Sequence, residues 1–142
     1  STHLIKIISE TAVGKREKVI VFGNDYPTKD GTAVRDYIHI TDLANIHLKV
    51  TEYLIENQKS DIINCGYGKG FSVNEVLQTA NAINDKQIIF EIGKRRKGDP
   101  AQLVSDVSKL HKLLNWQPEY NNLSFIIKTS IKWEKMQNKE NA

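Results

Sequence analysis

Cysteine, methionine and proline are scarce in this 142-residue chain, which has one cysteine, one methionine and three prolines. The single cysteine, Cys65, excludes an intramolecular disulfide, so a reducing, cytoplasmic setting is expected. No apolar run approaches the roughly 18 residues that a bilayer span needs, and no signal-peptide pattern opens the chain. These absences exclude a disulfide-stapled secreted domain and favour a protein without a membrane partner.

The charge of the chain is mildly positive, with 20 Lys and Arg residues against 17 Asp and Glu residues and a net charge of +3. This balance suits an anionic small molecule as well as nucleic acid. The basic cluster at residues 94–97 is short and is followed by Asp99, which makes it a poor stripe for a duplex. We therefore expect a small-molecule ligand and no nucleic-acid partner.

Helical and extended patterns alternate along the chain, which predicts an α/β fold. The chain begins at Ser1 inside the first helical pattern, so we expect a fragment or a processed product of a longer protein. Thr41 or Asp42 is expected to cap the second helix, and Ser72 with Glu75 to form a capping box for the third. Helices are predicted at 3–13, 42–57, 73–83, 106–114 and 122–131, strands at 18–22, 61–65 and 86–90, and an extended piece at 36–40.

Two loops each place an arginine beside polar or aromatic residues. The first spans residues 31–37 and contains Arg35, and the second spans residues 95–99. Because a guanidinium is a planar fork of donors that matches phosphate oxygens, two of them in one site could hold a pyrophosphate. The alternative is structural: Arg35 and Asp36 would form an ion pair, and residues 94–97 a solvated basic face.

A glycine loop at residues 66–70 is similar to a dinucleotide-binding loop, since it lies between a predicted strand and a predicted helix. Glu91 even follows where such a fold would place its ribose carboxylate. However, the spacing is Gly-x-Gly-x-Gly, with the last glycine one place early, and Ser72 and Glu75 already cap the helix that a pyrophosphate would need. The pattern therefore favours a structural turn over an NAD site.

The remaining candidate side chains point to packing. Histidines 39, 47 and 111 have no ligand spacing, so no metal site is expected, and His39 is interpreted as a packed or loop-anchoring residue. Trp116 and Trp133 are predicted to lie in the core or between helices. Residues 123–131 carry an amphipathic apolar face. A fragment could leave this face, or the opening helix, uncovered and available for self-association.

A long motif, FGNDYPTKDGTAVRDYIHITDLA at residues 22–44, resembles the signature of the UDP-galactose 4-epimerases, which are extended members of the short-chain dehydrogenase/reductase superfamily. The resemblance continues through residues 64–66, 70–73, 95–99 and 115–116, and so covers nearly the whole chain. It implies that residues 1–142 form a C-terminal, substrate-binding lobe of the α/β class. Residues of about 36–65 would belong to the Rossmann-type parallel sheet of the parent.

The resemblance also implies a UDP-sugar site. Ile20 and Phe22 correspond to strand-end residues whose backbone reads the uracil edge, with the aromatic ring packing beside the base. Arg35 and Arg96 look like the two arginines that clamp the diphosphate, and Asp99 resembles the carboxylate that holds the uridine ribose.

Four further positions are carried over from the same family. Tyr37 would lie in the same wall as Asp99, and Val73 would line the nucleotide pocket. His3 stands where the family usually has an asparagine at the substrate edge. Leu103 occupies the position whose bulk governs the room around the second carbon of the sugar, so a leucine there would admit N-acetylated sugars.

The implied activity is the interconversion of UDP-glucose and UDP-galactose, in which NAD takes and returns a hydride at carbon 4 and a Tyr-x-x-x-Lys base moves the proton. No tyrosine in this chain has a lysine four places on. The family's N-terminal glycine fingerprint for NAD is also absent. We therefore expect a chain that binds but does not catalyse, from a homodimeric parent that holds NAD mainly through an N-terminal part.

Two alternatives stay open. The parent could act on UDP-N-acetylhexosamines or UDP-uronic sugars in place of UDP-glucose. From a different class, the chain could be a stand-alone module that binds UDP-sugars and never joins a catalytic half.

Overall fold

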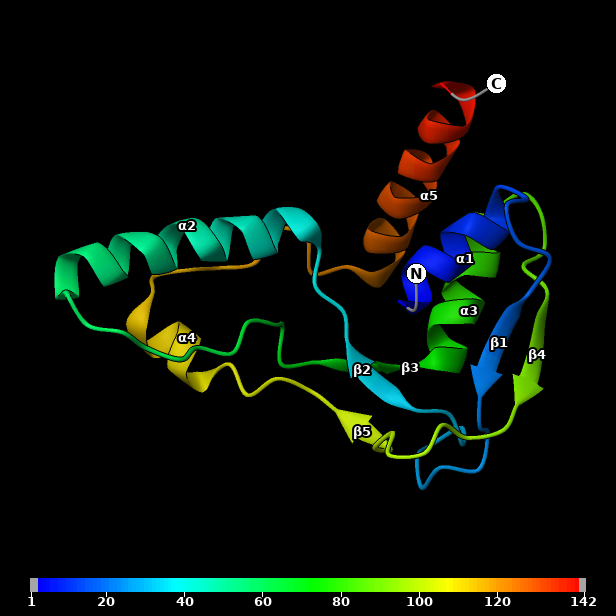
Figure 1. Ribbon diagram of the computed structural model, residues 1–142, viewed down its shortest axis with the longest axis horizontal. Helices are drawn as coiled ribbons and strands as arrows, with labels where there is room; N and C mark the ends of the chain where they lie inside the picture. The colour runs from blue at the N-terminus through cyan, green and yellow to red at the C-terminus, as the bar shows by residue number, and fades with distance from the viewer. Residues whose placement is uncertain (1–2, 141–142) are drawn as a thin grey trace.

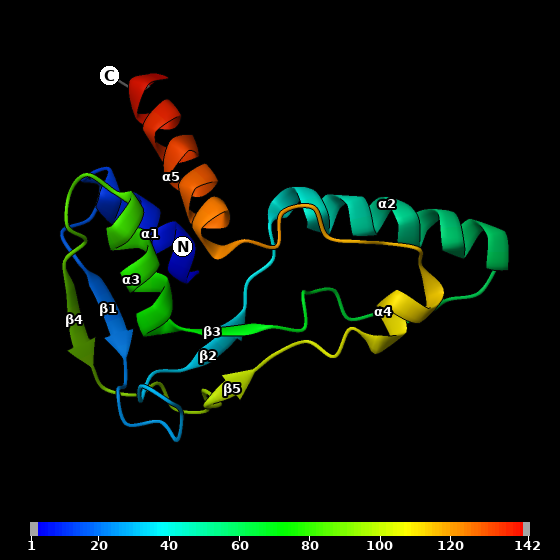
Figure 2. The same cartoon turned by 180° about the vertical axis from the view of Figure 1, so that it is seen from behind.

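The computed structural model describes residues 3–140, with side chains up to residue 138 (Figure 1). Its elements are α1 (Leu4–Ala12), β1 (Val19–Phe22), β2 (Val34–Asp36), α2 (Ile40–Asn57), β3 (Gly70–Ser72), α3 (Val73–Ile83), β4 (Phe90–Gly93), β5 (Gln102–Leu103), α4 (Ser108–Leu113) and α5 (Leu123–Glu140). Helices α1, α3 and α5 gather beside β1 and β4 in one lobe, whereas α2 and α4 extend away as a second, smaller lobe (Figures 1 and 2). The predicted α/β class is confirmed.

Two small sheets organise the strands. β1 and β4 pair in parallel, from Val19 opposite Phe90 to Phe22 opposite Gly93. The second sheet has the order β3-β2-β5, with β2 antiparallel to β3 and parallel to β5. The third predicted strand is displaced: it was expected at residues 86–90, but the ladder starts at Phe90 because β1 offers partners from that point onward. Ile88, just before it, is buried.

The larger lobe has a continuous apolar core. Helices α1 and α3 contribute one face each, and the apolar face of α5 closes the core from the other side, so the prediction that this face lies uncovered is wrong. Trp133 was also predicted to pack, but it is 57% exposed. The buried members are Ile8, Val19, Val21, Val76, Leu77, Ala80, Ile88, Leu123, Ile127 and Ile131.

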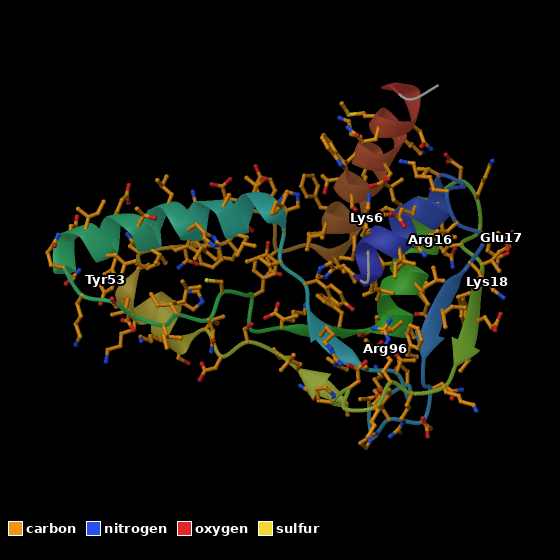
Figure 3. All side chains as sticks on the ribbon, viewed as in Figure 1. Lys6, Arg16, Glu17, Lys18, Tyr53 and Arg96 are labelled. Carbon is orange, nitrogen blue, oxygen red and sulfur yellow. The ribbon has the colours of Figure 1, made fainter. Side chains whose placement is uncertain are left out.

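The smaller lobe has its own core, formed by Ile46 of α2 and by Leu110, Leu114 and Trp116 from α4 and the segment after it. Tyr53 packs on this core from the side of α2 that faces α4 (Figure 3). The core placement of Trp116 is confirmed, at 2% exposure.

The strand predicted at residues 61–65 is not formed. A strand needs a neighbour for its backbone hydrogen bonds, and in the described part of the chain this segment pairs with no other strand. Ile62, in its middle, is 86% exposed. The segment runs below α2 in the view of Figure 1 without a strand partner among the described residues, and side-chain contacts such as that from Lys109 to the Ile62 carbonyl hold it.

The two lobes are joined by a hydrogen-bonded cluster around Asp42, whose side chain is buried. Its carboxylate accepts the hydroxyl of Tyr67 at 2.5 Å and the backbone N–H of Tyr120 at 3.0 Å. The same tyrosine hydroxyl accepts the N–H of His39 at 3.2 Å. Burial, together with the bond to Asp42, raises the pKa of Tyr67, so its hydroxyl remains a donor.

His39 caps α2, in place of the expected Thr41 or Asp42. Its Nδ1 accepts the N–H of Thr41 at 3.2 Å, while Nε2 lies 3.1 Å from the hydroxyl of Thr129 on α5. This pattern requires Nδ1 without a proton and Nε2–H as the donor. The prediction of a loop-anchoring histidine is confirmed, and Asp42 is left to serve the inter-lobe cluster.

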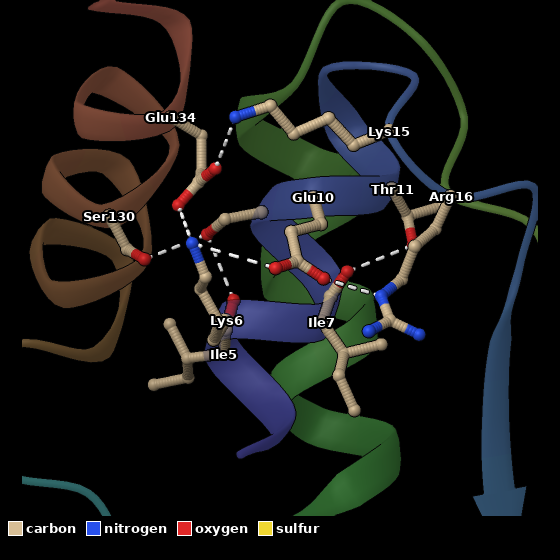
Figure 4. Close-up of polar contacts among 10 residues, drawn as sticks. Ile5, Lys6, Ile7, Glu10, Thr11, Lys15, Arg16, Ser130 and Glu134 are labelled. Carbon is tan, nitrogen blue, oxygen red and sulfur yellow. Dashed lines mark hydrogen bonds and ion pairs between the residues drawn. The ribbon is translucent and has the colours of Figure 1, made fainter. Parts of the chain in front are cut away.

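An ion cluster ties α1 to α5 (Figure 4). Glu134, 1% exposed, accepts from the ammonium of Lys6 and, at 3.1 Å, from that of Lys15. The bond from Lys6 is the largest cause of a lowered pKa at Glu134, and it raises the pKa of Lys6 in return. Beside them the hydroxyl of Ser9 donates to that of Ser130 at 2.8 Å.

We predict that Glu134→Gln lowers the free energy of unfolding at pH 7 by about 1–3 kcal/mol, because two charge-assisted hydrogen bonds are weakened. A depressed carboxyl pKa adds stability above the unfolded value near 4.5, and that stability is lost as the pH falls through the folded value. Urea titrations from pH 7 to pH 3 should therefore show a steeper loss in the wild type than in Glu134→Gln. The exposed Glu52→Gln is the control, and parallel curves for wild type and Glu134→Gln would refute this account.

We predict that Tyr67→Phe lowers the free energy of unfolding by about 1–3 kcal/mol, since buried Asp42 loses a donor. Tyr53→Phe, on the same small core, should change it by less than about 0.5 kcal/mol. Equal thermal midpoints for the two variants would show that the Tyr67 hydroxyl does not secure the junction between the lobes.

Candidate functional site

A cavity of about 480 Å³ opens between α1, β1, β2 and the loop that follows β4. Eight of the nine residues predicted to bind substrate line it: His3, Ile20, Phe22, Arg35, Tyr37, Val73, Arg96 and Asp99. They come from segments far apart in the sequence, so the fold has brought them together. The ninth, Leu103, does not line the cavity and is 62% exposed.

Leu103 nevertheless lies beside the cavity. In β5 it pairs with Arg35 of β2. Residues paired across a ladder project to the same side of a sheet, so Leu103 continues the face that carries Arg35, one strand further out.

The alternation of side chains along a strand divides the Arg35-Asp36-Tyr37 motif between two faces. Arg35 and Tyr37 project toward the cavity, and Asp36 projects toward the glycine loop. Burial raises the pKa of Tyr37 to about 12, although the charge of Arg35 opposes the shift. The phenol is therefore neutral at physiological pH and can donate a hydrogen bond into the cavity.

The carboxylate of Asp36 is hydrogen-bonded to the glycine loop. Its carboxylate accepts the N–H of Tyr67 at 3.1 Å and that of Gly68 at 3.0 Å. The approach requires a glycine at position 66, where a Cβ atom would lie 2.5 Å from the Asp36 carboxylate. Within the described residues no ion pair joins Arg35 to Asp36, so the structural alternative for this pair is not realised; Arg35 Nη1 donates to its neighbouring carbonyl, that of Val34, at 2.7 Å.

The glycine loop does not fit the pyrophosphate of NAD. Its N–H groups at positions 67 and 68 already bind a carboxylate of the same chain. The start of the following helix is closed by the predicted capping box: Ser72 Oγ accepts the N–H of Glu75 at 3.0 Å, and the Glu75 carboxylate accepts the N–H of Ser72 at 2.7 Å. The helix terminus therefore has no open donors at these positions for a phosphate.

The open edge of β1 lies at the cavity. The N–H of Val19 and that of Gly23 both donate to β4 and its continuation, at 2.9 Å each. Because backbone groups alternate sides along a strand, the N–H and C=O groups of Ile20 and Phe22 point to the other edge. In the described part of the chain no strand pairs with that edge, so it can read the edge of a planar polar ring.

Arg96 stacks on the wall of the cavity. Its guanidinium lies over the ring of Phe22, 3.8 Å from the ring centre, between β1 and β2 in the view of Figure 3. A guanidinium that stacks on a ring keeps its N–H donors in its own plane for an anion. The N–H of Asp99 donates to the Arg96 carbonyl at 3.3 Å, and this turn carries both side chains to the cavity.

Together these groups suit a ligand with a diphosphate, a planar ring with a polar edge, and hydroxyl groups. Two guanidinium groups could bind the phosphates, an exposed strand edge could pair with the ring, and a carboxylate could accept from a diol. Within residues 3–138 no group of three or more His, Cys, Asp or Glu side chains could hold a metal ion. No helix in the described part of the chain is long and apolar enough to cross a membrane.

Several cavity residues were missed by the sequence analysis. They are mainly apolar side chains of α1 and of the segments around β2, where helical or strand spacing indicated burial but gave no hint of a ligand. The missed residues are Leu4, Ile5, Ile7, Val21, Ala33 and Ile38. Asp36 also borders the cavity, although its carboxylate binds the glycine loop.

The chain is similar in sequence to a known protein family and to curated proteins of that family. A family model described as GDP-mannose 4,6 dehydratase matches residues 1–129. A UDP-glucose 4-epimerase from Halalkalibacterium halodurans is 42% identical over 134 residues. That alignment covers 94% of this chain and 40% of the relative, so the chain spans about two fifths of the curated protein that it matches.

Solved structures agree with this placement. A UDP-Glc/GlcNAc 4-epimerase from Campylobacter jejuni superposes with a TM-score of 0.85 at 47% identity, covering 94% of this chain and 40% of that one. A UDP-glucose 4-epimerase from Stenotrophomonas maltophila, with bound NAD and formylated UDP-arabinopyranose, gives 0.92 at 34% identity, covering 99% and 41%. The chain thus belongs to the GDP-mannose 4,6 dehydratase family of extended short-chain dehydrogenases/reductases, and it is similar to the C-terminal part of the UDP-glucose 4-epimerases.

Proposed function

We propose that the chain is the UDP-binding part of a UDP-glucose 4-epimerase. The observation that carries the proposal is the meeting of Arg35 and Arg96 at one cavity, next to the open edge of β1. This arrangement matches the chemistry of a uridine diphosphate, and the similarity of the chain to UDP-glucose 4-epimerases supports the same ligand.

Each group has a proposed contact. Arg35 and Arg96 donate to the diphosphate, and their fixed charge balances the charge of its oxygens. The backbone of Ile20 and Phe22 reads the uracil edge. Asp99 accepts from the ribose hydroxyls.

The remaining cavity residues form the walls around these contacts. Tyr37 and Val73 would lie against the nucleotide, and His3 at the edge nearest the sugar. Leu103, on the outer strand of the same sheet, would approach the second carbon of the sugar in the parent.

The epimerase reaction itself is proposed for a parent protein and not for this chain alone. The chain spans about 40% of its relatives, and it has no tyrosine followed by a lysine four places on. Since the glycine loop does not fit NAD, the parent would hold this cofactor through its other part. We propose that residues of about 36–65 join that part, where unpaired residues 61–65 would gain a strand partner. The cytoplasmic location and the homodimeric parent stay predictions.

An N-acetylated substrate is the second candidate. Leu103 is smaller than a tyrosine and is largely exposed, and the similar Campylobacter jejuni enzyme is described as a UDP-Glc/GlcNAc 4-epimerase. Both observations support room for an N-acetyl group on the sugar.

We predict that the labelled chain binds UDP at millimolar concentrations in an NMR titration, with shifts around Phe22 and Arg35. Arg96→Ala should weaken this binding at least about tenfold, because charge-assisted bonds to a phosphate are lost. Lys97→Ala removes the same charge from the same loop outside the cavity, and we expect it to bind UDP nearly as the wild type does.

NAD and AMP serve as parallel ligands in this titration. Shifts with NAD at residues 66–70 would overturn the assignment of the glycine loop as a structural turn. Equal affinity of wild type and Arg96→Ala for UDP would overturn the proposed diphosphate clamp. Activity of the chain without its parent would contradict the assignment of catalysis to the other part.

We predict that Leu103→Tyr, made in the full-length parent, lowers kcat/KM for UDP-GlcNAc more than for UDP-glucose. The added ring would occupy the space that the N-acetyl group needs, and steric exclusion of this kind changes selectivity by one or two orders of magnitude, roughly. Steady-state rates with both sugars measure the ratio. An unchanged ratio would show that Leu103 does not set the room at the second carbon.

A further inference from the structure

The loop between β4 and β5 presents Arg96 and Asp99 to the cavity, yet residues 94–100 are exposed along their whole length. An exposed loop is the part of a fold with the fewest packing contacts to fix it. At its ends the backbone is tied, because Gly23 donates to Gly93 at 2.9 Å and Val34 donates to Ala101 at 2.8 Å. Between these ends the loop needs side-chain contacts to hold one position.

Arg95 makes such contacts with the loop that follows β1. Its Nε donates to the carboxylate of Asp25 at 2.5 Å, and its Nη2 donates to the backbone carbonyl of the same residue. Its guanidinium also lies over the ring of Tyr26, 4.1 Å from the ring centre. The position of this ring is fixed by packing, since Tyr26 is buried, with 5% of its surface exposed. Three interactions thus converge on one guanidinium.

The fit between the two loops depends on Gly23. A Cβ atom there would lie 2.5 Å from Cγ of Arg95 and 2.9 Å from the ring of Tyr26, so the stem of Arg95 lies directly against the glycine backbone. The φ of Gly23 is +89°, a conformation that other residues rarely adopt. The contacts of Arg95 with Asp25 and Tyr26, called the clasp below, therefore depend on the backbone conformation of the loop that follows β1.

The neighbouring residues Arg95 and Arg96 therefore make different contacts. Arg96 stacks on Phe22 and faces the cavity, whereas Arg95 stacks on Tyr26 and grips Asp25 on the outside. We propose that Arg95 is a positioning residue, which holds the loop so that Arg96 and Asp99 meet the ligand in place. This inference rests on the proposed binding of UDP.

The clasp should contribute little to the free energy of unfolding, but it should fix the position of the loop between β4 and β5. Arg95 is 40% and Asp25 71% exposed at the side chain, and exposed ion pairs contribute little to the free energy of unfolding. Fixing a loop in its binding position, however, removes an ordering cost from the binding step. Variants in the clasp should therefore weaken the binding of UDP and leave the thermal midpoint close to that of the wild type.

The test compares UDP with uridine, which lacks the diphosphate, by NMR titration of the labelled chain. We expect Arg95→Ala to raise the Kd for UDP about three- to tenfold, with a thermal midpoint close to that of the wild type. The Kd for uridine should rise less, because uridine keeps the contact with Asp99 but has no phosphate for Arg96. General destabilisation would weaken both ligands alike.

Two further variants separate position from charge. Arg95→Lys keeps the positive charge but loses the planar fork, so it should bind UDP as weakly as Arg95→Ala. Asp25→Asn removes a negative charge from the loop that follows β1. By charge alone this would tighten the binding of an anion, but loss of the contact with Arg95 should weaken it. Lys97→Ala is the control for loss of one charge in the same loop.

The outcomes are distinguishable. If wild type binds UDP and Arg96→Ala does not, while Arg95→Lys and Asp25→Asn bind as tightly as wild type, the positioning role is overturned and the proposed function stands. If Arg95→Lys restores wild-type affinity, Arg95 acts through its charge, and the positioning role is again overturned. If wild type does not bind UDP, the proposed function fails, and this inference fails with it.

Discussion

The carboxylate of Asp36 fixes which face of β2 points into the cavity. β2 has three residues, too few to define an orientation by their own packing, and it lies between β3 with three residues and β5 with two. By accepting two N–H groups of the glycine loop, Asp36 ties one face of the strand to that loop. Alternation then turns Arg35 and Tyr37 to the opposite face. The cavity, the closed glycine loop and the path of the chain into α2 all depend on this anchor.

The architecture assigns binding to the larger lobe and connection to the smaller one. The cavity walls come from α1, β1, β2 and the loop after β4, and they carry cationic, apolar and carboxylate groups in separate places. Helices α2 and α4 of the smaller lobe contribute no residue to this lining. Its own core is four buried residues, and its contact with the larger lobe passes through the cluster of Asp42, Tyr67 and His39. This division agrees with a chain that holds a ligand while the reacting groups lie elsewhere.

Local patterns predicted much of the fold, because helices and capping boxes depend on residues close in sequence. α1, α2 and α3 lie within a few residues of their expected positions, and the Ser72–Glu75 box is present. The errors concern features set by partners: residues 61–65 lack a neighbour, and β4 begins where β1 allows it. For the site, the family motif indicated residues that the fold gathers at one cavity. It could not reveal the clasp of Arg95, because that contact joins residues 70 positions apart.

The proposed binding mode places uridine diphosphate along the open edge of β1, with its phosphates at Arg35 and Arg96. Intermolecular nuclear Overhauser effects between UDP and the isotope-labelled chain test it most directly, since they report which protons lie within about 5 Å of the ligand. We expect contacts from the uracil H5 proton to Ile20 and Phe22. Contacts from uracil or ribose protons to residues 66–72, or a saturated complex without contacts to β1, would contradict it.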